Sequence, residues 1–211
     1  MEVYVVRHGE SLAMADPASA GDMDSGLSPR GRWQARQIGA RLSAVGIALV
    51  ASSPLIRALE TATLLTEAAA ISAPVEVWPE LREGIAGTLR GPGRSALLAR
   101  FPGAVLPLEL GEVGLDYGGE SPGAIAERAA RVWERLFARG GPSDHVAIVT
   151  HAGLGAALLR HALGSVRAPS GYALSPGSLT TLLVTPRVAP ERPDDAPWAE
   201  ALTLNDTAHL H

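Results

Sequence analysis

The sequence predicts an α/β fold with a three-layer, open and mostly parallel sheet, helices on both faces and a small cap or lid insertion. Short apolar runs rich in β-branched residues alternate with longer segments in which apolar residues recur at helical spacing. Three of the expected helices open on a Ser-Pro pair, which is typical of a helix N-terminus. Strands that alternate with helices in this way indicate a parallel sheet.

The chain has 211 residues, of which 46% are hydrophobic. A chain of this length buries roughly 70% of the surface of its unfolded state, so it can form a core without disulfides or metals. Residues 79–119 are rich in glycine and show no sustained period. A stretch of that length without a pattern is usually functional. We therefore expect residues 1–211 to form a single domain with a cap inserted at about 79–119.

In the first half of the chain, the run Glu2–Val6 predicts a strand that ends at Arg7-His8-Gly9. Ser28-Pro29 then begins a helix with arginines on its outer face. Ser53-Pro54 begins the next helix, which runs to about residue 70. The apolar face of the first helix is expected to hold Trp33, Ile38, Leu42 and Val45, and further strands are expected at 47–51 and 75–78.

In the second half, we expect a helix at 94–100 within the cap and a helix at 121–138 that begins at Ser121-Pro122. The run at 145–150 predicts a strand, followed by a turn at 151–153. The remaining expected elements are a helix at 154–163 and strands at 178–184 and 199–204, joined by a proline-rich loop at 185–197.

The residue inventory excludes several kinds of chemistry. Cysteine is absent, which removes disulfides, thiolate metal sites and cysteine nucleophiles. All 18 basic residues are arginine, so a Schiff-base lysine and a phosphate loop with a lysine are also excluded. The net charge of -4 argues against nucleic acid or an anionic membrane as a partner. Any bound anion must therefore be held by a few placed arginines.

No apolar run reaches the roughly 18 residues of a membrane span. Residues 2–7 already predict a strand and Arg7 ends the first apolar run, so we expect no secretory signal. The expected location is the cytoplasm. A homodimer is left open as the assembly.

The predicted strands bring polar side chains to one edge of the sheet. His8, Ser52-Ser53 and His151 each follow the end of an expected strand. In an open α/β sheet the ligand binds at the carboxyl ends of the strands. Arg57 falls in the first turn of the helix after the second strand and reaches the same edge. We therefore expect two histidines and two arginines, Arg7 and Arg57, to converge there.

Such a cluster favours phosphoryl transfer. Guanidinium groups match phosphate oxygens bidentately and keep their charge. The helix N-termini near Ser53 and Ala152 would add N–H donors to an anion. A neutral imidazole beside that anion can attack phosphorus as a nucleophile. Charge would then be stabilised by arginine and histidine, with no cofactor.

A metal site is the competing use of the histidines. His145 and His151 are six residues apart on one strand, which separates them by about 20 Å at roughly 3.3 Å per residue. His8 and His151 with a carboxylate are the other option, but Arg7 and Arg57 would repel the cation. The sequence therefore predicts no metal.

These residues resemble the motifs of the histidine phosphatase superfamily, in the branch similar to phosphoglycerate mutase. The resemblance extends over nearly the whole chain, and its blocks follow the family order. The matching blocks are Arg7-His8-Gly9-Glu10-Ser11, Leu27-Ser28 with Gly31 and Gln34-Ala35, Ala51–Ala58 with Thr61-Ala62, Leu81-Arg82-Glu83 with Gly87 and Gly91, Gly118–Ser121 with Arg128, Val149–Gly153, and the tail Leu204–Leu210.

The resemblance implies a role for each matching site residue. His8 would be the nucleophile that becomes phosphohistidine. Arg7, Arg57 and His151 would bind the phosphoryl group and stabilise its transition state. Glu83 would be the general acid that protonates the leaving oxygen and then the base that activates water. The implied activity is hydrolysis of a small-molecule phosphate monoester.

Three positions depart from the family pattern: Met14 replaces an asparagine that donates to phosphate, Arg90 replaces a glutamate of the cap, and Pro176 replaces an asparagine. Ser11 or a backbone N–H is the expected substitute for the lost donor. Two alternatives therefore stay open beside the phosphatase: a phosphoglycerate mutase, and a non-catalytic protein that binds a phosphorylated ligand.

Overall fold

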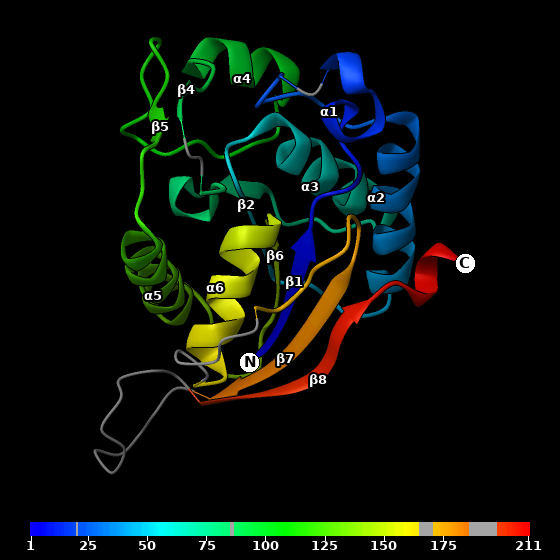
Figure 1. Ribbon diagram of the computed structural model, residues 1–211. Helices are drawn as coiled ribbons and strands as arrows, with labels where there is room; N and C mark the ends of the chain where they lie inside the picture. Colours follow the sequence, from blue (N-terminus) through cyan, green and yellow to red (C-terminus); the bar gives the residue numbers. More distant parts are fainter. Residues whose placement is uncertain (20, 85–86, 165–170, 186–197) are drawn as a thin grey trace.

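One six-stranded sheet, in the order β3-β2-β6-β1-β7-β8, organises the computed structural model of the protein (Figure 1). The structure describes residues 1–19, 21–84, 87–164, 171–185 and 198–211. The first four strands in that order run parallel, and the last two join antiparallel. The strands are β1 (Glu2–Arg7), β2 (Leu49–Ser52), β3 (Val75–Val77), β6 (His145–Thr150), β7 (Leu179–Thr185) and β8 (Trp198–Asp206).

Helices cover both faces of this sheet (Figure 1). One face packs on α2 (Pro29–Leu42) and α3 (Ile56–Ala68), and the other on α5 (Pro122–Arg139) and α6 (Ala152–Ala162). Alternate residues of β1 serve the two layers, since Val3 and Val5 face α5 and α6 while Tyr4 and Val6 face α2 and α3. The predicted three-layer α/β fold is confirmed.

Residues 79–119 are less irregular than the sequence indicates. The expected helix is present as α4 (Arg94–Arg100), and a second, two-stranded sheet pairs β4 (Thr88–Arg90) with β5 (Asp116–Gly118). α4 packs on the α2–α3 side of the core through Leu97 and Phe101. Figure 1 places α4, β4 and β5 beyond the end toward which β1 points. The remaining short elements are α1 (Leu12–Ala15) and 3-10 turns at Pro17–Ser19, Pro79–Leu81 and Ala208–Leu210.

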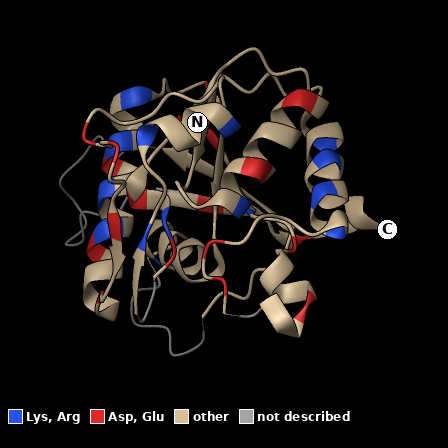
Figure 2. Cartoon of the chain, turned by 90° about the horizontal axis from the view of Figure 1, so that it is seen from above, with Lys and Arg blue, Asp and Glu red and all other residues tan. Residues whose placement is uncertain are grey.

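The predicted caps of two helices are confirmed. The Ser28 hydroxyl accepts the N–H of Gly31 at the start of α2, and the Ser121 hydroxyl accepts the N–H of Ala124 at the start of α5. The arginines of α2 are exposed, as expected, and line the helix beside the C-terminus in Figure 2.

Several predicted boundaries and one packing assignment are wrong. Trp33 is 43% exposed rather than part of the apolar face of α2, because Gln34, Ala35 and Ile38 occupy the buried side. That helix ends at Leu42, before Val45. α6 begins at Ala152, two residues earlier than expected, with His151 at its N-cap. The predicted proline-rich loop at 185–197 lies, from residue 186 on, outside the described residues.

Among the described helices, none is long and apolar enough to cross a membrane.

Candidate active site

The candidate site lies where β1, β2 and β6 end. These strands are parallel neighbours, so their carboxyl ends meet at one edge of the sheet. The ladder of backbone bonds continues one residue past each strand: the N–H of His8 donates to the Thr150 carbonyl at 2.9 Å, and the N–H of Ser53 donates to the Val149 carbonyl at 3.0 Å. The side chains of His8 and Ser53 therefore project from backbone that is held by the hydrogen bonds of the sheet.

The imidazole of His8 is held in one tautomer. Its Nδ1 lies 2.7 Å from the carbonyl oxygen of Gly9, and because a carbonyl only accepts, Nδ1 carries the proton. Nε2 then has a free lone pair, toward which the Nε–H of Arg57 points at 3.2 Å. Burial lowers the pKa of His8 to about 3, with Arg57 and Arg7 adding to the effect. The ring is therefore neutral at cellular pH, and its unprotonated Nε2 faces Arg57.

The loop after His8 is fixed by close backbone packing. A Cβ atom at Gly9 would lie 2.5 Å from the carbonyl oxygen of Gly31, so only glycine fits there. The N–H of Gly9 donates to the Thr61 hydroxyl at 3.1 Å, and that hydroxyl donates to the Arg57 carbonyl at 2.7 Å. The backbone around His8 is thereby tied to the helix that carries Arg57.

Arg57 is the second residue of α3, and residues distant in sequence orient it. The predicted start of this helix at Ser53-Pro54 is wrong, since α3 begins at Ile56. The side chain of Asp24 accepts the N–H of Ile56 at 2.7 Å, and the Met23 carbonyl accepts from Arg57 at 2.9 Å. Burial raises the pKa of Asp24 to about 6. No local pattern singled out Asp24, because its partner lies 32 residues further along the chain.

His151 is fully buried beside His8, and their ring centroids are 4.9 Å apart. Its Nε2 forms a hydrogen bond of 2.7 Å with the Ser53 hydroxyl. Its Nδ1 has no hydrogen-bond partner among the described residues. Burial holds the pKa of His151 well below its usual range, and the neighbouring charge of Arg57 acts in the same direction. Both imidazoles of the site are therefore neutral.

Arg7, the last residue of β1, is the second arginine of the site. One terminal nitrogen of its guanidinium donates to the Leu174 carbonyl. Its Nε is buried and has no hydrogen-bond partner among the described residues. Burial lowers the pKa of the Arg7 guanidinium from its usual value, while Glu83 opposes that shift. The guanidinium thus keeps an unused buried donor close to His8 and Glu83.

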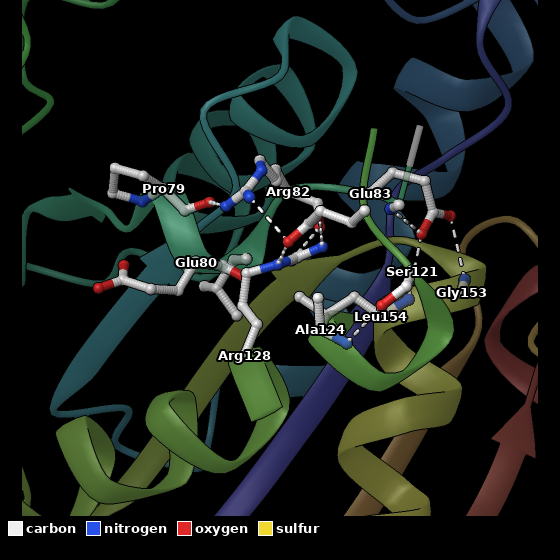
Figure 3. Close-up of polar contacts among 12 residues, drawn as sticks. Pro79, Glu80, Arg82, Glu83, Ser121, Ala124, Arg128, Gly153 and Leu154 are labelled. Atoms are coloured by element: carbon white, nitrogen blue, oxygen red, sulfur yellow. Dashed lines mark hydrogen bonds and ion pairs between the residues drawn. The ribbon is translucent and has the colours of Figure 1, made fainter. Parts of the chain in front are cut away.

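Glu83 reaches the site from the segment after the 3-10 turn Pro79–Leu81. Its carboxylate accepts the N–H groups of Gly153 at 3.0 Å and Leu154 at 3.1 Å, and that of Gly84 at 2.9 Å (Figure 3). Gly153 and Leu154 belong to the first turn of α6, whose positive dipole end favours an anion. Glu83 therefore sits at the helix end that follows His151.

A buried charge network fixes the backbone just before Glu83 (Figure 3). The guanidinium of Arg128, 1% exposed, donates to both carboxylate oxygens of Glu120 at 2.9 and 2.6 Å. Its remaining terminal nitrogen donates to the carbonyls of Glu80 and Arg82, each at 2.7 Å. The Arg82 guanidinium forms an ion pair with the Glu120 carboxylate at 2.9 Å. Burial pushes the pKa of Glu120 upward, but the hydrogen bonds from Arg128 together with the charges of Arg128 and Arg82 hold that pKa below its usual value.

Sequence reasoning placed Arg128 in a motif but gave it no role. Its contacts with the carbonyls of Glu80 and Arg82, which precede Glu83, supply one, since they orient the segment that carries this carboxylate.

The two other predicted phosphate-binding residues are Ala152 and Ser11. Ala152 is the first residue of α6, so its N–H belongs to the open end of that helix. Ser11 is buried at the N-cap of α1, and its hydroxyl makes no hydrogen bond to another described residue. The structure thus joins His8, Arg57 and His151 by direct contacts and links Ser11 to them only through the chain. Among the described residues, no three histidine or acidic side chains are arranged to hold a metal ion.

The comparisons with known proteins agree on one family. The sequence model of the histidine phosphatase superfamily (branch 1) matches residues 3–189. A glucosyl-3-phosphoglycerate phosphatase of Mycolicibacterium vanbaalenii is 32% identical over 77% of this chain and 74% of its own length. A probable phosphoglycerate mutase GpmB of Erwinia tasmaniensis is 39% identical, but over only 42% of this chain and 40% of the relative.

A solved structure supports the same family. The mycobacterial glucosyl-3-phosphoglycerate phosphatase in complex with inorganic phosphate superposes with a TM-score of 0.66 at 25% identity, covering 99% of this chain and 98% of that one.

Proposed function

The chain belongs to the histidine phosphatase superfamily, and from that premise we propose that it hydrolyses small-molecule phosphate monoesters through a phosphohistidine at His8. The observation that carries the proposal is the state of the His8 ring. Its proton is fixed on Nδ1 by the Gly9 carbonyl, and its Nε2 lone pair is directed at Arg57. A neutral, oriented imidazole beside two guanidiniums is what attack on a phosphate dianion requires.

In the first step, Nε2 of His8 attacks phosphorus, a P–N bond forms and the P–O bond to the leaving group breaks. Arg57 and the unused Nε–H of Arg7 bind the equatorial oxygens, where negative charge is spread in the transition state. The N–H of Ala152 at the open end of α6 adds a donor to the same group. His151, which contacts the His8 ring, completes the phosphoryl pocket.

Glu83 is the proposed general acid and base of the two steps. It lies at the end of α6 next to His151, held by the N–H groups of Gly153 and Leu154. It enters the first step as the carboxylic acid and gives that proton to the leaving oxygen; in the second step the carboxylate takes a proton from the water that attacks phosphohistidine, which restores the acid. The P–N bond then breaks, and orthophosphate and a neutral His8 are released.

We assign residues 79–119 as a cap that contacts the leaving group. Four cap arginines are already engaged within the protein: Arg82 with Glu120, Arg90 with Asp116, Arg94 with the carbonyls of Leu110 and Pro107, and Arg100 with Glu60. Three of the four charges are offset by carboxylates and the Arg94 donors are used on carbonyls, so few cap donors remain for a second anionic group. This supports a monophosphate of modest charge as substrate.

The test is hydrolysis of 4-nitrophenyl phosphate in the presence of EDTA. We expect turnover in the wild-type protein and its loss in His8→Ala. Wild-type activity in His8→Ala would rule out the covalent role of this residue. Binding of orthophosphate without turnover of a broad panel of monoesters would instead favour the non-catalytic phospho-ligand protein.

A second candidate is a phosphoglycerate mutase, since relatives of that name match the chain over part of its length. A mutase returns the phosphoryl group from His8 to the substrate instead of to water. Incubation with 3-phosphoglycerate separates the two: the phosphatase releases orthophosphate, and the mutase forms the 2-phosphate isomer.

A further inference from the structure

The end of the chain contacts a loop that supports the candidate site. The residues Asn205–Leu210, which we name the tail, comprise the last two residues of β8 and the 3-10 turn Ala208–Leu210 near α2. The Nε2 atom of His209 lies 2.9 Å from the Gly177 carbonyl oxygen. The side chain of Asn205 accepts the N–H of Ser175 at 2.6 Å and donates to its hydroxyl at 3.3 Å. The tail thus forms hydrogen bonds with two residues of the loop 174–178, Ser175 and Gly177.

The same loop holds the backbone of Arg7 and His8 and the side chain of Arg7. The N–H of Gly177 is shared between the carbonyls of Arg7 at 3.2 Å and His8 at 3.1 Å. The Arg7 guanidinium donates to the Leu174 carbonyl, and the Arg7 N–H donates to the Ser178 carbonyl at 3.2 Å. A shift of this loop therefore moves the phosphate-binding guanidinium and the nucleophile together.

The backbone conformation of this loop depends on Gly177. Gly177 has a φ of +74°, a region that side chains other than glycine rarely adopt, and a Cβ atom there would lie 3.0 Å from Gln34. Both polar backbone groups of Gly177 are used: the N–H by Arg7 and His8, and the carbonyl by His209. Without the tail, the carbonyl loses its partner and the loop loses one of its fixed ends.

We propose that Asn205 and His209 are positioning residues of the active site, which act on His8 and Arg7 through the loop 174–178. The inference rests on the proposed function. Because a carbonyl only accepts, Nε2 of His209 carries the proton in this contact. Burial lowers the pKa of His209. A neutral side chain with a donor at the same place, such as glutamine, is therefore expected to preserve the contact, whereas leucine fills the space without a donor.

The experiment compares His209→Leu with His209→Gln on 4-nitrophenyl phosphate, at a temperature where far-UV circular dichroism shows both folded. For His209→Leu we expect kcat to fall about tenfold to a hundredfold, with a much smaller change in KM. His209→Gln should recover most of that loss. A folded His209→Leu with wild-type kcat, or a glutamine variant no better than the leucine variant, would overturn the proposal.

Two further variants complete the test. Asn205→Gly keeps the positive φ of Asn205, +50°, while removing both side-chain bonds, and it replaces His209→Leu if that variant does not fold. His211→Leu is the matched control: His211 is exposed and makes no hydrogen bond to another described residue, so its kcat should equal that of the wild type.

The affinity for vanadate, which mimics the transition state of phosphoryl transfer, separates failure of this inference from failure of the proposed function. If the wild type binds vanadate but hydrolyses no monoester, the phosphatase is wrong, and weaker vanadate binding by His209→Leu than by His209→Gln still supports positioning. Equal vanadate affinity in the two variants and the wild type would reject it.

Discussion

The Nε–H of Arg57 lies 3.2 Å from Nε2 of His8, the ring nitrogen that carries no proton. Beside burial, the charge of Arg57 thereby favours the neutral form of His8, and under the proposed function Arg57 lies next to the atom that attacks phosphorus. The alignment of Arg57 with His8 is held by Thr61, Met23 and Asp24, which contact Arg57 or the start of its helix.

Arg57→Gln should therefore lower kcat by about a hundredfold to a thousandfold, the range for losing one donor to a developing charge. The same change should raise the pKa of His8, since the positive charge of Arg57 is one of the causes that lower it. Turnover of 4-nitrophenyl phosphate and titration of His8 by NMR measure the two effects. An unchanged His8 pKa would show that Arg57 does not act on the free ring.

Glu83→Gln should slow the hydrolysis of alkyl phosphates by about a hundredfold or more, because a poor leaving oxygen needs a proton. The first step with 4-nitrophenyl phosphate should suffer far less, since nitrophenolate leaves without one. Single-turnover rates for both substrates give the ratio. Glu80→Gln is the matched control: Glu80 lies three residues earlier and pairs with Arg135, so its loss should leave both rates unchanged. An equal loss for both substrates would contradict the acid role of Glu83.

Glu120→Gln should destabilise the protein by about 3 kcal/mol or more, because it leaves the buried Arg128 guanidinium without its counter-charge. Asp116→Asn removes the partner of Arg90 in an exposed pair and should change stability little. Urea unfolding of the two variants gives the comparison. Equal stability losses would show that burial of the Arg128–Glu120 pair does not decide its energetic weight.

Asp24→Asn should change how stability depends on pH. The pKa of Asp24 rises from 3.8 to about 6 on folding, so between these values the folded state holds a proton that the unfolded state has released. The stability that this proton provides is present at pH 4 and is lost as the pH rises through 6. The wild type should lose on the order of 1–2 kcal/mol relative to Asp24→Asn between pH 4 and pH 7.

Asparagine at position 24 keeps an oxygen that can accept the N–H of Ile56. The other titratable groups are the same in both proteins, so their contribution cancels when the stabilities of the wild type and Asp24→Asn are subtracted. Thermal or urea unfolding of the pair at pH 4, 5, 6 and 7 gives the result. A stability difference that does not vary with pH would mean that Asp24 does not titrate in this range.

Much of the fold and part of the site follow from local sequence. The strands that end just before His8 and His151 are short apolar runs buried on both faces, which identifies their ends, and the parallel sheet then brings those ends together. The Ser-Pro pairs at Ser28 and Ser121 mark helix starts because the cap bond is local.

The remaining features depend on contacts between distant segments. Ser53-Pro54 has the same local pattern, but α3 begins two residues later because Asp24 supplies the cap from another loop. The β4–β5 sheet has strands of only three residues in a glycine-rich stretch, too short for a period to show. The bonds of Arg128 to the segment of Glu83, and of His209 to Gly177, likewise join residues that no local pattern connects.

The central claim is the phosphohistidine at His8, and trapping it is the most direct test. Glu83→Gln is mixed with substrate and quenched in alkali, in which phosphohistidine survives, and the peptide released by cleavage after Arg7 is analysed by mass spectrometry. We expect one phosphoryl group on His8, more abundant than in the wild type because water is no longer activated. Substrate turnover with no phosphorylated His8 in either protein would contradict the account.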